Sequence, residues 1–236
     1  MGSAPGIERR ERGRELRALV EVLVLAAAWN LVGNLLLPSG WYVPANLAVA
    51  GVVVLIARKA GVSAAELGLA RRDLASGVRV GLVATAAVAT VLLVAVALPA
   101  ADSFLDDEVV ATDSTAMRWF RPLVRIPLGT VVFEELLFRS VLFGLLVRLR
   151  GDTAALVGTA GLFGLWHVVP TWETAEGGTA SLAGALAGTV VLTTVAGVLF
   201  GLLRRWSRSV VAPMLAHWSV NALAYLAALV SMDLIG

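Results

Sequence analysis

Long hydrophobic runs follow one another along the chain and are separated by shorter polar connections. A helix needs roughly 20 apolar residues to cross the hydrocarbon core of a bilayer, and seven runs approach or reach that length. These runs are residues 18–37, 41–57, 78–98, 122–149, 153–169, 181–203 and 209–232. The pattern predicts an all-α protein, a polytopic membrane helix bundle with about seven transmembrane helices.

The distribution of charge among the connections predicts how this bundle is oriented. Basic residues precede the first run and gather in three later connections. These connections are residues 58–79, 148–150 and 204–208. The connection at residues 101–113 is acidic instead. Because cytoplasmic connections are enriched in lysine and arginine, we expect a cytoplasmic N-terminus. Arg118, Arg121 and Arg125 are exceptions, since they lie at the predicted outer end of the fourth run.

Composition agrees with a membrane protein and excludes several other classes. Of the 236 residues, 58% are hydrophobic and 15% are charged, whereas about a quarter of the residues of a soluble domain are charged. The chain has no cysteine, which excludes disulfides, thiolate metal sites and a cysteine nucleophile. The net charge of +2 is small, and the arginines do not form a patch typical of nucleic-acid binding. We therefore expect no nucleic-acid partner.

The fifth and sixth runs contain glycines at spacings of three or four residues. They are Gly158, Gly161 and Gly164 in the fifth run, and Gly184, Gly188, Gly197 and Gly201 in the sixth. Small residues allow membrane helices to approach one another closely. We therefore expect these glycines to lie where helices pack.

The fourth run carries three charged residues within six positions, Glu134, Glu135 and Arg139. An ionisable group in a membrane helix costs roughly 2.5–3.5 kcal/mol on insertion scales, and it usually faces the protein interior and serves function. Glu135 and Arg139 are four residues apart, so they share a helix face and are expected to pair. Glu134 lies about 100° further round the helix and is the expected free carboxylate. A charge network that only holds helices together is the alternative.

Both histidines of the chain lie in later hydrophobic runs. His167 ends the stretch "FGLWH", and His217 begins "HWSVN", in which Asn221 lies four residues later on the same helix face. A single buried histidine is often a packing residue with a hydrogen bond. Two histidines and a glutamate pair on separate helices, all able to reach middle depths of the membrane, favour a shared site.

These residue types suit hydrolysis of an amide bond. The carboxylate of Glu134 and the imidazole of His167 are able to hold and deprotonate a water molecule. His217 and Asn221 are able to donate hydrogen bonds to the developing oxyanion. Alternatively, Glu134, His167 and His217 bind a divalent metal such as zinc, with water completing the site. The chain has no His-Glu-x-x-His motif and no pair of aspartates within the hydrophobic runs, which argues against two other classes of membrane protease.

The three motifs resemble those of a known family. "EELLFR" (residues 134–139), "FGLWH" (163–167) and "HWSVN" (217–221) are similar, in this order, to the motifs of the CPBP family. This family comprises the CAAX prenyl endopeptidases and bacteriocin-processing intramembrane proteases, also called the Abi family. The resemblance covers roughly residues 122–225, and the first three runs match it only in being hydrophobic.

The resemblance implies roles for the motif residues. Glu134 and His167 would activate the water, Glu135 and Arg139 would support them, and His217 with Asn221 would stabilise the oxyanion. The family is described both as metalloproteases and as metal-independent, glutamate-dependent enzymes, so a zinc cofactor stays open. The implied substrate is a membrane-associated or lipid-anchored protein or peptide in the bilayer, and the oligomeric state is open. A non-catalytic scaffold or bacteriocin-immunity factor is the alternative function, followed by a proton-coupled transporter.

On this interpretation the chain has three parts. Residues 1–17 are a basic cytoplasmic N-terminus, and residues 18–117 hold the first three transmembrane helices with an amphipathic segment near residues 63–77 at the membrane interface. Residues 118–236 form the catalytic transmembrane core. No small-residue cleavage site follows the first run, so we expect it to be a retained helix rather than a signal peptide. Heavy use of arginine and alanine favours a bacterial source, and hence the bacterial cytoplasmic membrane.

Overall fold

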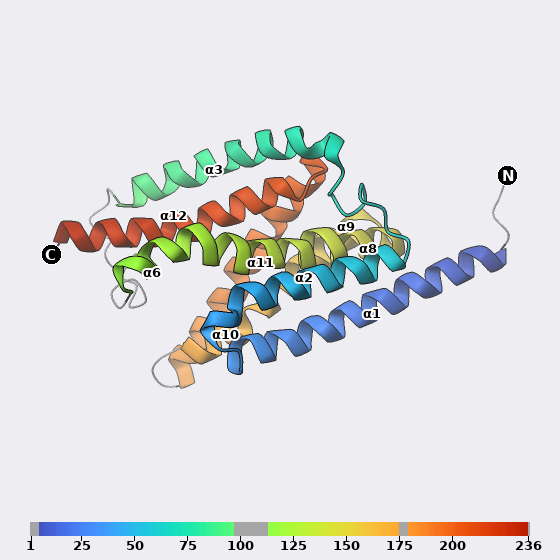
Figure 1. The fold of residues 1–236 in the computed structure, drawn as a ribbon, viewed down its shortest axis with the longest axis horizontal. Coiled ribbons are helices and arrows are strands. Elements are labelled where there is room, and N and C mark those ends of the chain that lie inside the picture. The colour runs from blue at the N-terminus through green and yellow to red at the C-terminus, as the bar shows by residue number, and fades with distance from the viewer. Residues whose placement is uncertain (1–4, 97–112, 175–178, 236) are drawn as a thin grey trace.

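The computed structural model describes residues 5–96, 113–174 and 179–235, and all regular structure in these ranges is helical. The helices run back and forth along the long axis of the molecule, and the two termini lie at opposite ends of it (Figure 1). Six of the described helices are long and apolar enough to cross a membrane. The prediction of an all-α polytopic membrane bundle is therefore confirmed.

The elements on either side of the fourth hydrophobic run follow the predicted spans. Those before it are α1 (Pro5–Leu35), η1 (Ser39–Trp41), α2 (Tyr42–Lys59), η2 (Arg71–Asp73) and α3 (Leu74–Val96). Those after it are α9 (Asp152–Trp166), α10 (Val168–Thr174), α11 (Thr179–Ser207) and α12 (Val211–Ile235). The fifth predicted span is thus divided at His167, which lies in a turn between α9 and α10.

The fourth predicted span is one continuous helical run, which we call the central helix. It consists of α6 (Thr115–Phe120), η3 (Arg121–Val131), α7 (Val132–Glu135), η4 (Leu136–Leu142) and α8 (Phe143–Arg150). The segments η3 and η4 are π-helical, a wide-turned form that is frequent at functional sites. The central helix packs against α2, α9 and α12. Charged residues in the middle of its hydrophobic run, Glu134, Glu135 and Arg139, distinguish it from the six apolar helices.

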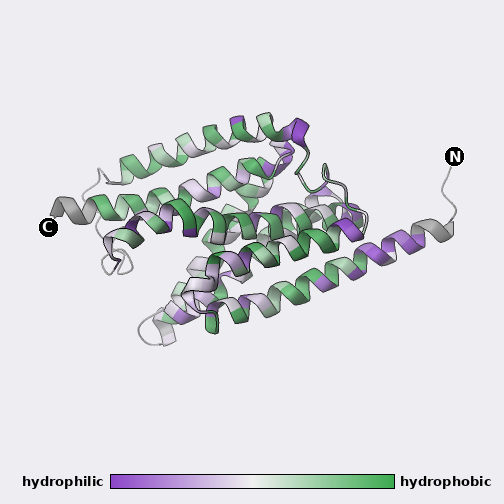
Figure 2. Cartoon of the chain, viewed as in Figure 1, coloured by the Kyte–Doolittle hydropathy of each residue, from purple (hydrophilic) through white to green (hydrophobic). Residues whose placement is uncertain are grey.

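The first helix begins well before the hydrophobic run that it contains. It starts at Pro5, so the basic segment predicted as a separate N-terminal part is helical and continues into the first span. Arginine and glutamate are good helix formers, and Arg14 lies 3.9 Å from Glu11 one turn earlier. Figure 2 shows that the hydrophilic residues of α1 lie at the same end of the bundle as the hydrophilic start of α3.

The segment predicted to lie at the membrane interface, near residues 63–77, is a turn-rich loop followed by η2 and the start of α3. Leu67 in this loop is fully buried. The Ser140 hydroxyl donates a hydrogen bond to the Leu67 carbonyl (2.7 Å), and the Val210 N–H donates one to the Gly68 carbonyl (3.0 Å). The loop therefore closes one end of the bundle. Gly68, at φ 71°, has the left-handed conformation that this turn requires.

The three arginines that broke the predicted charge pattern are engaged locally. Arg121 pairs with Asp113 through two hydrogen bonds, and Arg118 Nε donates to the Asp113 carbonyl at 3.3 Å. The Arg125 guanidinium lies over the Tyr42 ring, 4.3 Å from its centroid. These contacts compensate the positive charges of three arginines that the positive-inside rule would place on the cytoplasmic side. The cytoplasmic position of the N-terminus stays a prediction.

The glycines of α9 and α11 fall into two groups. A Cβ at Gly164 would collide with the Thr194 hydroxyl, one at Gly201 with the Leu156 side chain, and one at Gly197 would lie 2.9 Å from the Ala160 Cα. Gly161, Gly184 and Gly188 have no such neighbour within 4 Å among the described residues, and Gly158 has only an ordinary contact, 3.5 Å from Leu146 Cδ1. The expected packing role is therefore confirmed for the first group and wrong for the second.

This difference predicts the effect of adding one methyl group to α11. Gly197→Ala would press on the backbone of α9, which a side-chain rotation cannot relieve, so we expect a loss of about 1–3 kcal/mol of stability. Gly188→Ala is the matched control, since it has free space and alanine favours a helix by about 1 kcal/mol. Thermal unfolding in detergent measures both. Equal melting temperatures for the two variants would contradict the assigned α9–α11 contact.

Candidate active site

The central helix places two adjacent glutamates inside the bundle. Glu134 and Glu135 form the end of α7, between the π-helical segments η3 and η4. Glu134 is 7% exposed and Glu135 is fully buried. Phe133, Leu137 and Phe138 belong to the surrounding hydrophobic core. Two carboxylates at such a position require polar partners from their own helix or from its neighbours.

Glu135 is joined to partners on two helices through one oxygen. Arg139 Nη1 donates to Glu135 Oε1 at 3.0 Å, which confirms the predicted pair on one face of the helix. His217 Nδ1, from α12, lies 2.9 Å from the same oxygen. A carboxylate oxygen only accepts hydrogen bonds, so Nδ1 carries the ring proton and is the donor of this hydrogen bond. Glu135 therefore holds the His217 ring in a set orientation.

Arg139 is enclosed by aromatic rings. Its guanidinium carbon lies 4.0 Å from the ring centroid of Phe163 and 5.1 Å from that of Phe200. Phe200 also stacks on the His217 ring, with centroids 5.0 Å apart. Cation–π attraction is stronger where water is excluded. These rings thus stabilise the charge of Arg139 while they position the imidazole.

Glu134 keeps one oxygen without a hydrogen bond. Its Oε1 accepts a hydrogen bond from the indole Nε1 of Trp166 at 3.1 Å. Its Oε2 lies 3.8 Å from His217 Nε2, which is beyond hydrogen-bond distance. Glu134 Oε2 is one of five buried side-chain polar atoms without a partner in the described residues, and four of the five belong to Glu134, Glu135 and Arg139. Such atoms point to a site that takes up water or substrate.

His167 lies where α9 ends, and this determines which of its ring nitrogens is available. Its Nδ1 is 2.8 Å from the Phe163 carbonyl oxygen, one helical turn earlier. A carbonyl only accepts hydrogen bonds, so Nδ1 is the donor and Nε2 holds the free lone pair of the neutral ring. Phe163 packs edge-on against the imidazole, with centroids 4.7 Å apart. His167 is thereby prepared to act as a base or hydrogen-bond acceptor at Nε2.

Glu134 and His167 line the same cavity, which has a volume of about 210 Å³. Its other walls come mainly from α1, α2 and the middle of the central helix, and they include Asn34, Tyr42 and Thr130. The Tyr42 hydroxyl and the Thr130 hydroxyl are 3.0 Å apart. The lining is therefore partly polar, and the cavity is large enough for several water molecules.

The other predicted site residues lie outside the lining of this cavity. Arg139 and Glu135 lie behind Glu134, and His217 reaches Glu134 from α12. Asn221 is half-buried on α12, one turn after His217. None of the described hydrogen bonds joins its side chain to the glutamates. Direct contacts thus join Glu134, Glu135, Arg139 and His217. His167 shares the cavity with Glu134, and the Asn221 amide lies apart from these contacts.

A divalent metal ion was one of the predicted alternatives for this site. Glu134 Oε2 and His217 Nε2 converge, but His167 is on the cavity side and makes no described contact with either residue. Among the described residues, no group of three or more His, Cys, Asp or Glu side chains is arranged to hold a metal ion. A catalytic zinc site requires three protein ligands. The side chains in these positions do not supply such a set.

Trp166 is a site residue that the sequence alone did not assign. Its indole binds Glu134, and its carbonyl accepts a hydrogen bond from Asn30 Nδ2 of α1 at 3.0 Å. A signal was available, because a buried indole N–H requires an acceptor and Trp166 precedes a histidine. The identity of that acceptor depends on how α9 packs against the central helix.

We expect Trp166→Phe to slow turnover with little effect on substrate binding. Phenylalanine keeps the ring contacts with Phe133 and Phe138, whose centroids both lie 5.7 Å from that of Trp166. The hydrogen bond to Glu134 is lost, and such a bond to a charged group is worth about 1.5–3 kcal/mol. A tenfold or greater fall in kcat at an unchanged KM is the expected result. A change confined to KM would assign Trp166 to substrate binding instead.

Comparison with protein families gives one match. Residues 117–223 match the family described as type II CAAX prenyl endopeptidase Rce1-like. The matched range contains every predicted site residue, and it leaves α1, α2 and α3 outside. Comparisons with curated proteins and with solved structures found no match. Together with the helices suited to crossing a membrane, the match supports an intramembrane protease of the CPBP family, in which residues 117–223 of this integral membrane protein are similar to the core of the Rce1-like CAAX prenyl endopeptidases.

Proposed function

We propose that the protein hydrolyses a peptide bond of a membrane-associated or lipid-anchored protein or peptide, using water activated by Glu134 and His167. The observation that carries this proposal is the shared cavity, into which Glu134 and His167 both face. Glu134 Oε2 has no hydrogen-bond partner in the described residues, and His167 Nε2 is left free by the bond from Nδ1 to Phe163. We place the reacting water in this cavity, between the Glu134 carboxylate and the His167 ring.

In the proposed reaction, the water oxygen attacks the carbonyl carbon of the scissile bond and its proton passes to Glu134. The carbonyl becomes an oxyanion in a tetrahedral intermediate. When the C–N bond breaks, the same proton is delivered to the leaving nitrogen, which departs as an amine. Glu134 is then a carboxylate again, and the new carboxyl group belongs to the product.

We assign the oxyanion to His217 and Asn221. Since His217 Nδ1 donates to Glu135, only its Nε2 is able to face the reaction. That atom donates a hydrogen bond only when both ring nitrogens carry a proton. Asn221 would add a second donor after a side-chain rotation. Such donors stabilise the transition state by several kcal/mol in other acyl-transfer enzymes.

The test is cleavage by the purified protein in lipid nanodiscs. The substrates are a peptide with a prenylated C-terminal CAAX sequence, the same peptide without the lipid, and a peptide anchored by a hydrophobic helix. We expect cleavage of at least one lipid-associated substrate, and a loss of that cleavage in His167→Ala. Wild-type rates in both Glu134→Ala and His167→Ala would refute the proposal. A wild-type protein that binds these peptides and cleaves none of them would favour a scaffold or immunity role.

The donor geometry also predicts the effect of metal removal. Because these side chains do not gather three metal ligands, we propose the glutamate-dependent form of the reaction. Activity is then expected to survive dialysis against EDTA, with the metal content measured before and after. Loss of activity on chelation, restored by Zn²⁺, would assign the reaction to the metal-dependent form.

A further inference from the structure

A second cavity lies at the end of α11 that precedes α12. Its volume is about 470 Å³, and it shares no lining residue with the cavity around Glu134. We call it the basic pocket, because it is lined by Arg204, Arg205 and Arg208, together with Trp206, Glu66 and Asp152. None of these residues takes part in the proposed reaction.

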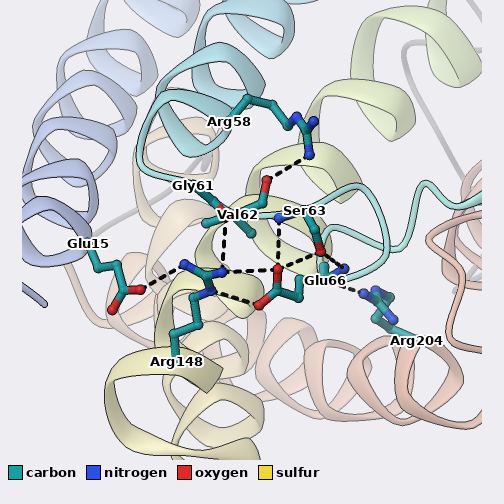
Figure 3. A network of polar contacts seen from close by, with 8 residues as sticks. All are labelled: Glu15, Arg58, Gly61, Val62, Ser63, Glu66, Arg148 and Arg204. Carbon is teal, nitrogen blue, oxygen red and sulfur yellow. Dashed lines mark hydrogen bonds and ion pairs between the residues drawn. The ribbon is translucent and has the colours of Figure 1, made fainter. Parts of the chain in front are cut away.

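The carboxylates of the basic pocket do not neutralise all of its arginines. Glu66 is engaged by Arg148, whose Nε donates to Glu66 Oε1 at 2.7 Å, and by Ser63 (Figure 3). Although burial alone would raise the pKa of Glu66, these bonds lower it to about 2, so Glu66 stays charged and bound to Arg148. Asp152 pairs with Arg205 at 3.4 Å. Arg204 and Arg208 have no ion pair with a described carboxylate.

Arg204 is held in place without a direct ion pair to a described carboxylate. It is only 6% exposed, and its Nη2 donates to the Glu66 carbonyl at 2.8 Å, so it binds the backbone rather than the carboxylate (Figure 3). Its guanidinium packs so closely on Gly68 that a Cβ there would collide with it. Its Nε is the fifth of the buried polar atoms that have no partner in the described residues. A buried, fixed and unpaired guanidinium is costly unless an anion completes it.

The basic pocket lies where a membrane surface is expected. The apolar span of α11 ends at Ser207, within the group of arginines. Trp206 is 69% exposed beside them, and exposed tryptophans are typical of the headgroup level of a bilayer. Arg208, at φ 58°, ends the helix and turns the chain toward α12. We therefore expect these arginines at the depth of lipid phosphates.

We propose that the basic pocket binds a phosphate oxyanion, carried by an anionic lipid headgroup or by a free phosphate. Arginine presents a planar set of donors that matches phosphate oxygens, and basic pockets between membrane helices recognise lipid headgroups. The pocket is walled by α8, α11 and the loop that carries Glu66. A bound phosphate would therefore hold these elements together at the end of the bundle.

The experiment measures the melting temperature of the full chain in detergent during titration. The titrants are short-chain phosphatidylglycerol, short-chain phosphatidylcholine and inorganic phosphate, at constant ionic strength. We expect saturable stabilisation by phosphatidylglycerol, by inorganic phosphate, or by both, and less by phosphatidylcholine. A response to phosphatidylglycerol alone identifies a lipid site, and a response to inorganic phosphate identifies a site for the free anion.

Two variants and a matched control make the test specific. In Arg205→Gln/Arg208→Asn, the apparent Kd for the stabilising titrant is expected to rise at least tenfold. Asparagine is chosen at position 208 because it tolerates the left-handed backbone there. Arg10→Gln/Arg12→Gln removes two exposed charges from α1 and should leave the Kd unchanged. Asp152→Asn removes a competing carboxylate and should lower the Kd, a gain that misfolding cannot produce. Equal stabilisation of the wild type and the pocket variant, or no saturable effect of any titrant, would overturn the proposal.

Discussion

Replacing Glu134 with glutamine is expected to reduce the rate of peptide cleavage by about 10²–10⁴-fold, the usual contribution of a general base. Glutamine has nearly the same shape, and its carbonyl oxygen is able to accept the hydrogen bond from Trp166 Nε1. It cannot take up a proton from water at neutral pH. The fold should persist, because a neutral amide is less costly in a membrane helix than a carboxylate.

The measurement is kcat and KM for Glu134→Gln in nanodiscs, alongside its melting temperature. Glu21→Gln is the control, since Glu21 is an exposed residue of α1 and makes the same chemical change far from the cavity. We expect the control to cleave like the wild type. If Glu134→Gln retains wild-type kcat while remaining folded, another group is the base and the proposed mechanism fails.

Replacing Arg139 with methionine is expected to lower the stability by about 3–5 kcal/mol, because removing one partner of a buried ion pair leaves the other charge uncompensated. Arg139 and Glu135 are both completely buried. Glu135 would then have only His217 as a described partner. Methionine fills much of the arginine volume and is able to pack on Phe163 and Phe200. The loss of stability therefore comes mainly from the missing charge.

A double-mutant cycle separates charge from packing in this cluster. In Glu135→Gln/Arg139→Met neither residue is charged, so we expect much of the lost stability to return. The free energy of unfolding, measured by chemical denaturation in mixed micelles, gives the coupling of the pair. If the double variant is as unstable as Arg139→Met, the aromatic contacts of Arg139 are the main contribution instead. Activity should remain low in the double variant, since the His217 ring would lose the carboxylate that orients it.

Several features of the site followed directly from sequence spacing. Glu135 and Arg139 are four residues apart, and the helix brings them to 3.0 Å even though η4 is π-helical. The order of the three motifs identified the family that the comparison confirms. Hydrophobic run lengths predicted the membrane helices, because the thickness of a bilayer imposes a minimum length on each. These are local or one-dimensional properties of the chain.

Other features depend on contacts between segments that are distant in the sequence. The cavity around Glu134 is walled by Asn34 and Tyr42, from helices outside the matched range. The bond from Trp166 to Glu134 joins residues 32 positions apart. Spacing does not show which helix will lie opposite a given side chain, because apolar helix surfaces pack against one another in many ways.

The sequence by itself determined that this is a helical membrane protein, that Glu135 pairs with Arg139, and that one glutamate is left over. Tertiary structure alone decided what surrounds that glutamate: Trp166 on one oxygen, the cavity shared with His167, and His217 3.8 Å from the other oxygen. It also decided that the loop of Leu67 closes the bundle and that Arg204 is buried without a direct ion pair among the described residues. The physical reason is that a buried polar atom must find its partner across a helix interface, and the packing of the whole bundle selects that partner.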